Sequence, residues 1–404
     1  MESKSFGTHS LFVTLLLAVA VAGALAGCDQ NVQPGPAFSA SDEAIRYTRA
    51  YNNGDDPGIA GEFALSAVDA QGHSRAITTL KEPNTDVAGI YLHIFAYGSG
   101  KLARFIPAEP EFGLSHGLSA GSPAQIEIVD LNTGAASQYQ APPVIDPYVG
   151  QSYFTTPFSP NGTQLIIPDR RNRNYYLLNL KNSQIAPIPN LKAFSIIGWS
   201  AADGLIYAHV IKLPGQGGGE VVEQVSPQGQ VLVLNLPHEG NNIYDEILSP
   251  DGKELYYRTV TSTQALPSPD PFNVRPEENV FERYDIASGS STIVARAAAG
   301  DDFSVGAFNF TLSSDGHSLA YVEERPTVTG TEQQGAATIW RVDLTLNSQP
   351  VKVIAGLNHP FRLLWCNESL YYYDGEVGWR GWHGMAMAGG KPVRIAGEVL
   401  GCAP

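Results

Sequence analysis

One four-residue turn recurs along the chain, and its recurrence restricts the fold more than any other feature. Ser249-Pro250-Asp251-Gly252 lies between two apolar runs in the stretch ILSPDGKELYYR. A short polar residue, a proline with φ near −65°, an aspartate and a glycine are the residues that favour a type I turn. No catalytic role is needed to explain these four residues, so the information lies in their copies.

Two further copies are strong: FSPNGTQLII at 158–167 and LSSDGHSLAYVEE at 312–324. Four weaker copies share an apolar residue, a polar turn and a following apolar run; they are FSASDEAIRYTRA (38–50), AYGSGKLARF (96–105), WSAADGLIYAHV (199–210) and WCNESLYYYDG (365–375). The pattern therefore occurs seven times.

A second hairpin pattern follows each copy: a strand ending near Asp or Asn, a short polar turn, and another strand. Its seven copies lie around Asp69, Asp130, Asn179, Ser226, Asp285, Asp343 and Gly389. The two series alternate strictly, so each unit of about 50 residues holds four antiparallel strands.

Four-stranded units repeated around an axis are the blades of a β-propeller. The fold class predicted is therefore all-β, a propeller of seven blades, and the pattern is also compatible with six or eight. Of the 404 residues, 41 are glycine and only 16% are charged, which agrees with an all-β chain. The stretches 212–220 and 261–279 are long enough to be insertions at the rim. The last residues, 394–404, are expected to add an innermost strand beside the first blade.

These repeats resemble those of the TolB-like, or WD40-like, propeller family, in which an apolar residue precedes Ser-Pro-Asp-Gly and a Leu-Tyr-rich strand follows. The match is good at 158–162, 248–252 and 312–316, partial elsewhere, and covers about residues 38–402. TolB's own propeller has six blades, so seven is a departure. The resemblance implies an envelope protein, or a peptide entering the channel mouth, as the partner.

The first 27 residues have the pattern of a signal peptide: Lys4, an apolar run from Leu11 to Val21, and small residues. They end in Leu25-Ala26-Gly27-Cys28, which resembles the lipobox of bacterial lipoproteins, where the cysteine is acylated, as with palmitate. The expected organisation is a signal peptide (1–27), a lipidated tether (28–37) and one propeller domain (38–404). Asp29 directly after the cysteine resembles the signal that retains lipoproteins in the inner membrane of enterobacteria. Other bacteria need not follow this sorting rule, so the sequence does not choose between the membrane leaflets.

The formal charge of −15 argues against nucleic-acid binding, because an acidic surface repels phosphate backbones and anionic lipid headgroups. The acyl group at Cys28 is then the expected membrane contact. Cys366 and Cys402 are the other two cysteines. Outside the cytoplasm they either pair or stay free, since the sequence does not show whether their Cα atoms come within bonding range.

The sequence carries no strong catalytic or metal motif. Cys-x-x-Cys, His-Glu-x-x-His, EF-hand and Gly-x-Ser-x-Gly patterns are all absent. Once seven blades are placed, no length remains for a hydrolase domain. We therefore expect a protein that is not an enzyme and has no resident cofactor.

The loops that join one blade to the next are expected to gather at one mouth of the central channel. They contribute six candidate ligand or partner residues: Asp146, His238, Glu239, Asp301, Asp302 and His359. Carboxylates with two imidazoles suit a divalent cation or a basic peptide. The alternative is that these side chains only solvate the loops of an acidic protein.

A glycine-rich segment near the end, GEVGWRGWHG, holds Trp379, Arg380 and Trp382. Exposed tryptophans beside an arginine are typical anchors for a protein or sugar partner. Tryptophans buried between blades would instead only fill space.

Together these features predict a membrane-anchored extracytoplasmic lipoprotein whose propeller binds a protein or peptide of the cell envelope. The alternatives are a propeller lyase or hydrolase, or a carbohydrate- or cation-binding protein, with its site at the channel mouth.

Overall fold

The computed structural model describes most of the repeats. The described residues are 41–50, 62–81, 94–106, 125–141, 157–169, 174–193, 195–201, 204–212, 219–234, 236–237, 243–261, 278–298, 310–324, 337–345, 348–358, 360–375 and 381–404. The regular elements among them are all β-strands. Cys28 and the rest of the first 40 residues lie outside this set.

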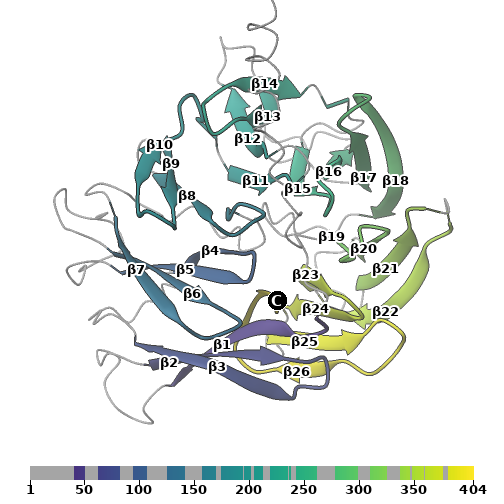
Figure 1. Cartoon of the computed structure of the whole chain (residues 1–404). Coiled ribbons are helices and arrows are strands. Elements are labelled where there is room, and N and C mark those ends of the chain that lie inside the picture. Colours follow the sequence, from purple (N-terminus) through teal and green to yellow (C-terminus); the bar gives the residue numbers. More distant parts are fainter. Residues whose placement is uncertain are drawn as a thin grey trace, which may run out of the picture.

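The strands form seven antiparallel sheets arranged in a ring (Figure 1). Blade 1 holds β1 (Ala44–Ala50), β2 (Glu62–Val68), β3 (Ser74–Lys81) and β27 (Glu398–Cys402). Blade 2 holds β4 (Ile94–Gly98), β5 (Lys101–Ile106), β6 (Gln125–Asp130) and β7 (Ala136–Gln140). Blade 3 holds β8 (Gln164–Asp169), β9 (Asn174–Asn179) and β10 (Ile185–Pro187).

The other four blades each hold four strands in chain order. Blade 4 consists of β11 (Ser195–Trp199), β12 (Ile206–Lys212), β13 (Gly219–Val225) and β14 (Val231–Leu234). Blade 5 consists of β15 (Ile243–Leu248), β16 (Glu254–Thr261), β17 (Glu278–Asp285) and β18 (Ser290–Ala298). Blade 6 consists of β19 (Phe310–Leu312), β20 (Ser318–Glu324), β21 (Ala337–Asp343) and β22 (Val351–Leu357), and blade 7 of β23 (Pro360–Cys366), β24 (Ser369–Asp374), β25 (Gly381–Ala386) and β26 (Val393–Ile395).

Blade 3 has a fourth, innermost line of chain that is too short to count as a strand. Phe158 bridges to Leu165, and the backbone N–H of Ile166 donates to the carbonyl of Pro157 over 2.8 Å. All seven blades are therefore four-stranded, and the predicted seven-bladed propeller is confirmed.

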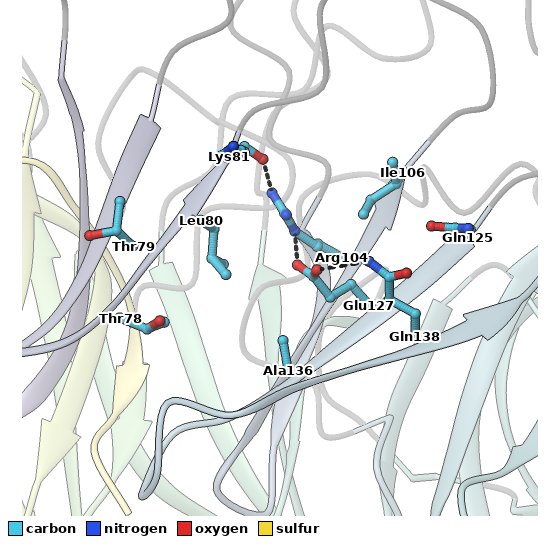
Figure 2. A pocket seen from close by; sticks show the side chains of 10 residues that line it. All are labelled: Thr78, Thr79, Leu80, Lys81, Arg104, Ile106, Gln125, Glu127, Ala136 and Gln138. Atoms are coloured by element: carbon cyan, nitrogen blue, oxygen red, sulfur yellow. Dashed lines mark hydrogen bonds and ion pairs between the residues drawn. The ribbon is translucent and has the colours of Figure 1, made fainter.

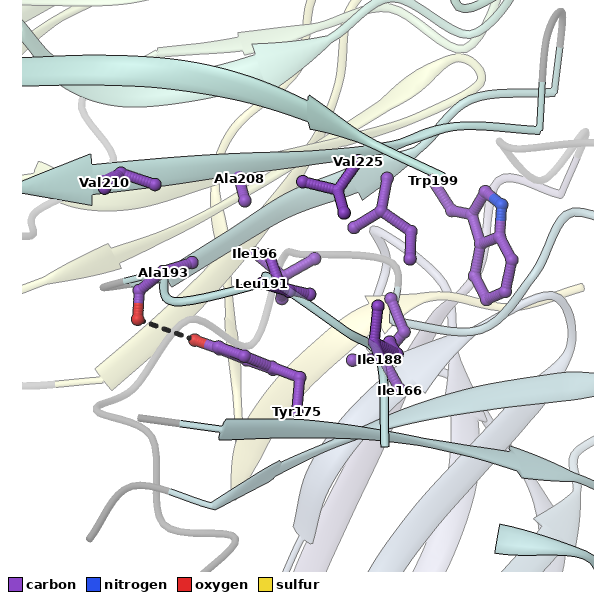
Figure 3. Close-up of a cluster of buried hydrophobic side chains, with 11 residues drawn as sticks. Ile166, Tyr175, Ile188, Leu191, Ala193, Ile196, Trp199, Ala208, Val210 and Val225 are labelled. Atoms are coloured by element: carbon purple, nitrogen blue, oxygen red, sulfur yellow. Dashed lines mark hydrogen bonds between the residues drawn. The ribbon is translucent and has the colours of Figure 1, made fainter. Parts of the chain in front are cut away.

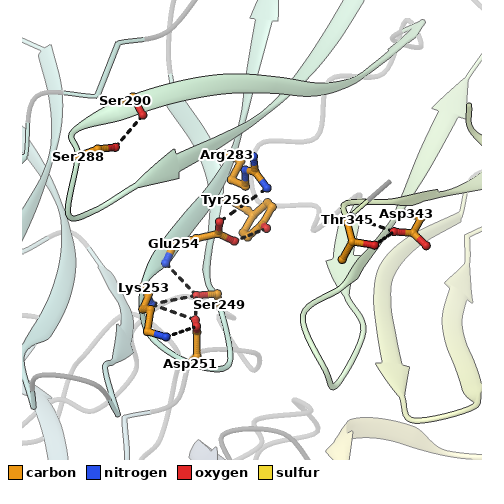
Figure 4. A network of polar contacts seen from close by, with 10 residues as sticks. All are labelled: Ser249, Asp251, Lys253, Glu254, Tyr256, Arg283, Ser288, Ser290, Asp343 and Thr345. Carbon is orange, nitrogen blue, oxygen red and sulfur yellow. Dashed lines mark hydrogen bonds and ion pairs between the residues drawn. The ribbon is translucent and has the colours of Figure 1, made fainter. Parts of the chain in front are cut away.

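The Ser-Pro-Asp-Gly stretch joins β15 to β16 and is a turn held by its own side chains (Figure 4). Ser249 Oγ donates to Asp251 Oδ1 over 2.8 Å and accepts the backbone N–H of Glu254 over 2.9 Å. Gly252 has φ of 73°, the left-handed region that glycine enters without steric cost. The turn closes the first hairpin of the blade, and its side chains hold the turn itself together.

The hydrophobic core of this propeller consists of separate clusters, each between two neighbouring blades. Residues of blades 3 and 4 interdigitate in the cluster of Figure 3, where Ile166 and Tyr175 face Trp199 and Val225. Such clusters follow one another round the ring, including one between blades 7 and 1 that contains Ala44, Val68 and Trp382. Because neighbouring blades cover both of its faces, the middle strand β16 is buried from Leu255 to Val260.

The ring is closed by β27, which pairs with β1 as the innermost strand of blade 1, as the sequence predicts. Ala403 extends this pairing by donating its N–H to the carbonyl of Glu43 over 2.8 Å. Cys402, at the end of β27, is joined by a disulfide to Cys366 of blade 7, with their Cα atoms 5.3 Å apart. We call β27 together with this bond the latch.

The two faces of the ring differ. The turn face carries the tight connections between strands three and four of each blade and, in blades 2 to 7, those between strands one and two. Among the described residues of this face, many Asp and Asn side chains accept a backbone N–H from their own turn; examples are Asp69, Asp130, Asn161, Asn179, Asp251, Asp285, Asp315 and Asp343. The opposite side, the loop face, carries the blade-to-blade connections and those between strands two and three.

Candidate functional site

The loop face is the candidate functional surface, and its described part is a layer of buried charges beneath the connections. The six predicted channel-mouth residues, Asp146, His238, Glu239, Asp301, Asp302 and His359, all lie outside the described residues. What the structure describes is the strand ends from which these loops leave. Three ion pairs with almost fully buried side chains lie at those ends.

The first pair joins the innermost two strands of blade 5. Arg258 donates through Nε to Asp245 Oδ2 over 2.9 Å and through Nη1 to Asn279 Oδ1 over 3.0 Å. The Arg258 and Asp245 side chains are 2% and 3% exposed. Burial raises the pKa of Asp245 to about 6, although the positive charge of Arg258 opposes that rise.

Asp245 also has an unusual backbone. Its φ is 51°, and it lies where the pairing of β15 with β16 shifts register between Tyr244 and Ile247. A non-glycine residue in the left-handed region costs on the order of 1 kcal/mol or more and persists only where its surroundings fix it. The hydrogen bonds from Arg258 provide that fixation, so the ion pair sets the path of the chain as it enters blade 5.

The second pair crosses from blade 4 to blade 5. His209 of β12 contacts Glu246 of β15 through Nδ1, and both side chains are at most 10% exposed. Glu246 adjoins Asp245 in the sequence, so the start of β15 is tied to the blade before it and to its own second strand. The connection between blades 4 and 5 thus ends on a rigid base.

A chain of hydrogen bonds on the other side of β16 continues this layer. Thr259 Oγ1 donates to Glu282 Oε1 over 3.1 Å, and Ser291 Oγ donates to Glu282 Oε2 over 3.2 Å. The hydroxyl of Tyr257 donates to the carbonyl of Pro237 over 2.7 Å, and burial raises the pKa of Tyr257 above its usual range. Neutral, hydrogen-bonded Tyr257 therefore supports the connection at its blade 4 end.

The third pair belongs to blade 2. Arg104 of β5 contacts the carboxylate of Glu127 on β6 and donates through Nη1 to the carbonyl of Lys81 over 2.7 Å. Lys81 is the last residue of β3 in blade 1, so this pair also fixes the beginning of a blade-to-blade connection. In chemical terms the three pairs fix the strand ends, and in the two arginine–carboxylate pairs the opposite charges neutralise each other within the fold.

Within the described residues, no group of three or more His, Cys, Asp and Glu side chains is arranged to hold a metal ion. The same part of the chain contains no helix long and apolar enough to cross a membrane.

Trp382 has no exposed surface. It lies in the core between blades 7 and 1, where its Nε1–H donates to Glu398 Oε2 of β27 over 3.0 Å. Trp382 therefore fills space between two blades, and it is not an exposed anchor for a partner. Trp379 and Arg380 lie outside the described residues.

The three buried pairs of the loop face are residues that reasoning from the sequence missed. A signal for them exists: Asp245 and Glu246 interrupt the apolar strand IYDEIL, and Arg104 interrupts KLARFI. A charge inside a run that should be buried requires a partner. The sequence alone does not tell which strand supplies it.

No protein-family profile matches the chain, and no curated protein matches it either. Solved structures do. TolB from Acinetobacter baumannii is 17% identical, with 89% of this chain and 83% of that chain covered and a TM-score of 0.42. A putative TolB from Agrobacterium tumefaciens is 19% identical, with 68% and 87% covered and a TM-score of 0.42.

The chain is similar to TolB proteins in fold. It is also similar to an oligogalacturonate lyase in complex with manganese, at 13% identity, 74% coverage of each chain and a TM-score of 0.45. At these identities the likeness concerns the propeller fold alone.

Proposed function

We propose that this chain is a membrane-anchored lipoprotein of the bacterial cell envelope, and that its propeller binds an envelope protein or a peptide through the loop face without catalysing a reaction. Lipid at Cys28 holds it on the membrane, with the propeller facing the periplasm or the cell exterior. Asp29 favours the inner membrane as its place.

The observation that carries this proposal is the difference between the two faces. On the turn face, side chains such as Asp69, Asp251 and Asp315 accept hydrogen bonds from their own turns. On the loop face, buried ion pairs such as Arg258 with Asp245 hold the strand ends from which the long connections leave. Variable loops on a rigid scaffold are the usual arrangement of a binding surface.

Crosslinking in the native envelope tests the binding surface. A photo-crosslinking residue at His238 or Asp301, in the loop-face connections, should capture a reproducible protein partner. The matched controls are Gln71 and Lys181, exposed positions in turns of the turn face. Capture from all four positions alike, or from none, would contradict the proposal.

Lipidation is tested separately. Cells expressing the wild-type chain and Cys28→Ser should be labelled with an alkyne analogue of palmitate. We expect label and membrane association in the wild type, and neither in the variant. Each methylene of an acyl chain that is buried in the bilayer strengthens membrane binding by roughly 0.8 kcal/mol, and the variant lacks these chains. Label on Cys28→Ser would show that the anchor lies elsewhere.

A further inference from the structure

A cavity of about 500 Å³ lies between blades 1 and 2, away from the ion pairs of blades 4 and 5 (Figure 2). One wall is β3, the outermost strand of blade 1, and the other is formed by β5, β6 and β7 of blade 2. Its size is within the range of about 300 to 1,000 Å³ in which proteins bind small molecules.

The floor of the cavity is polar but electrically balanced. Arg104 and Glu127 face each other across β5 and β6, and both residues are at most 6% exposed. Glu127 Oε1 also accepts a hydrogen bond of 3.5 Å from Gln138 Nε2 on β7. The guanidinium and the carboxylate neutralise each other, so the floor attracts neither cations nor anions strongly.

The walls combine uncharged polar groups with apolar surface. Thr78 contributes a hydroxyl, and Gln125 and Gln138 contribute amides, each of which can donate and accept hydrogen bonds. Leu80 and Ile106 add apolar surface beside them. A ligand that fits needs hydroxyl groups at its edge and C–H groups on its faces.

We propose that this cavity binds a small neutral carbohydrate. A sugar ring has hydroxyls that both donate and accept, which suits hydroxyl and amide walls, and its C–H faces suit Leu80 and Ile106. This is a second site, separate from the protein-binding loops proposed above.

Among the lining residues, Lys81 carries a charge that no other lining residue neutralises. Its attraction for an acidic ligand is too weak to favour such a ligand over a neutral carbohydrate. Its side chain is exposed, and an exposed ion pair contributes little in water. The chain as a whole carries −15, which repels anions from a distance.

The test is saturation-transfer difference NMR on the full chain in a sugar-free detergent. The probes are glucose, galactose and N-acetylglucosamine, with glucuronate and glucosamine as charged comparators. We expect at least one neutral probe to bind with a Kd on the order of 1 mM, as befits so small a ligand. Failure of all three neutral probes, or tighter binding of a charged comparator, overturns the proposal.

Two substitutions locate the site while keeping both Arg104 and Glu127 of the buried pair. Ala136→Trp places an indole in the cavity from the exposed strand β7 and should weaken binding roughly tenfold or more. Its matched control is Ala186→Trp, an exposed alanine on β10, the outermost strand of blade 3. Gln138→Ala should also weaken binding, whereas Gln230→Ala, at an exposed glutamine near β14, should not.

Each variant is first shown to melt at the wild-type temperature. Unchanged binding by folded Ala136→Trp, or equal loss in Ala186→Trp, overturns the assignment to this cavity. Because the probes are free sugars and no protein partner takes part, the outcome is independent of the crosslinking experiment.

Discussion

Asp251 and Asn161 occupy the same turn position in blades 5 and 3 and make the same hydrogen bonds. Each side-chain oxygen accepts a hydroxyl hydrogen bond of 2.8 Å from the serine two residues earlier and a backbone N–H bond of 3.1 Å from the residue two positions later. The turn therefore needs the oxygen and not the charge. This explains why the copies vary between Asp and Asn while the hairpin persists.

The charge nevertheless makes stability depend on pH. Burial alone would raise the pKa of Asp251 and of Asp315, but hydrogen bonds from Ser249 and Ser313 and from the turn backbone lower it below the usual value. A lowered folded-state pKa gives stability that is present above the unfolded pKa of about 4 and is lost as pH falls through the folded pKa. These carboxylates therefore stabilise the fold at neutral pH and not in acid.

The double variant Asp251→Asn/Asp315→Asn tests this. At pH 7 it should unfold at slightly lower urea than the wild type, by a small margin because both side chains are more than half exposed. Below pH 4 the two urea midpoints should converge. A gap that stays constant from pH 7 to pH 2 would show that the turn charges contribute nothing.

At the scale of strands, the ion pair in blade 5 connects three of them. Asp245 lies on β15, Arg258 on β16 and Asn279 on β17, and all three are buried. Asp245→Ala leaves the guanidinium without its carboxylate and should lower the free energy of unfolding by about 3 to 5 kcal/mol. Denaturant unfolding measures the loss.

The double variant Asp245→Ala/Arg258→Met removes both charges and is the control. It should be more stable than the sum of the two single losses predicts, because no isolated charge stays buried. Strictly additive losses would mean that the two side chains do not interact in solution.

The blades could be predicted from the sequence, and the ion pairs could not, for one physical reason. A turn such as 249–252 and the alternation around it are local, so the seven copies fixed the strand order and even the place of β27. Whether Arg104 meets Glu127 depends on the register between strands whose connection spans 107–124. The channel-mouth residues lie outside the described residues and stay predictions.

At the scale of the whole molecule, the latch joins the first blade of the ring to the last. Deleting Glu398–Pro404 removes the innermost strand of blade 1, Val399 and Leu400 from two interblade cores, and the disulfide. The melting temperature of the truncated chain should fall well below that of the full chain. An unchanged melting temperature would mean that the ring does not depend on the latch.

The disulfide alone should contribute less to the stability of the fold than the whole latch does. Cys366 and Cys402 are 36 residues apart, and a loop of that length corresponds to about 4 kcal/mol of lost unfolded-state entropy. Cys402→Ser should therefore lower the denaturation midpoint. A reducing agent should lower the midpoint of the wild type to the same value and leave the midpoint of the variant unchanged. A reductant effect on Cys402→Ser would point to another cause.

The pairing of β1 with β27 also sets an order of assembly. β1 belongs to the first blade made, yet its partner is the last strand in the chain, so its inner edge stays open until the other six blades exist. Contacts between such distant residues slow folding, and an open strand edge accepts any matching strand. At high concentration, β27 of one molecule can complete blade 1 of another, and strand-exchanged dimers are the misfolded form to expect.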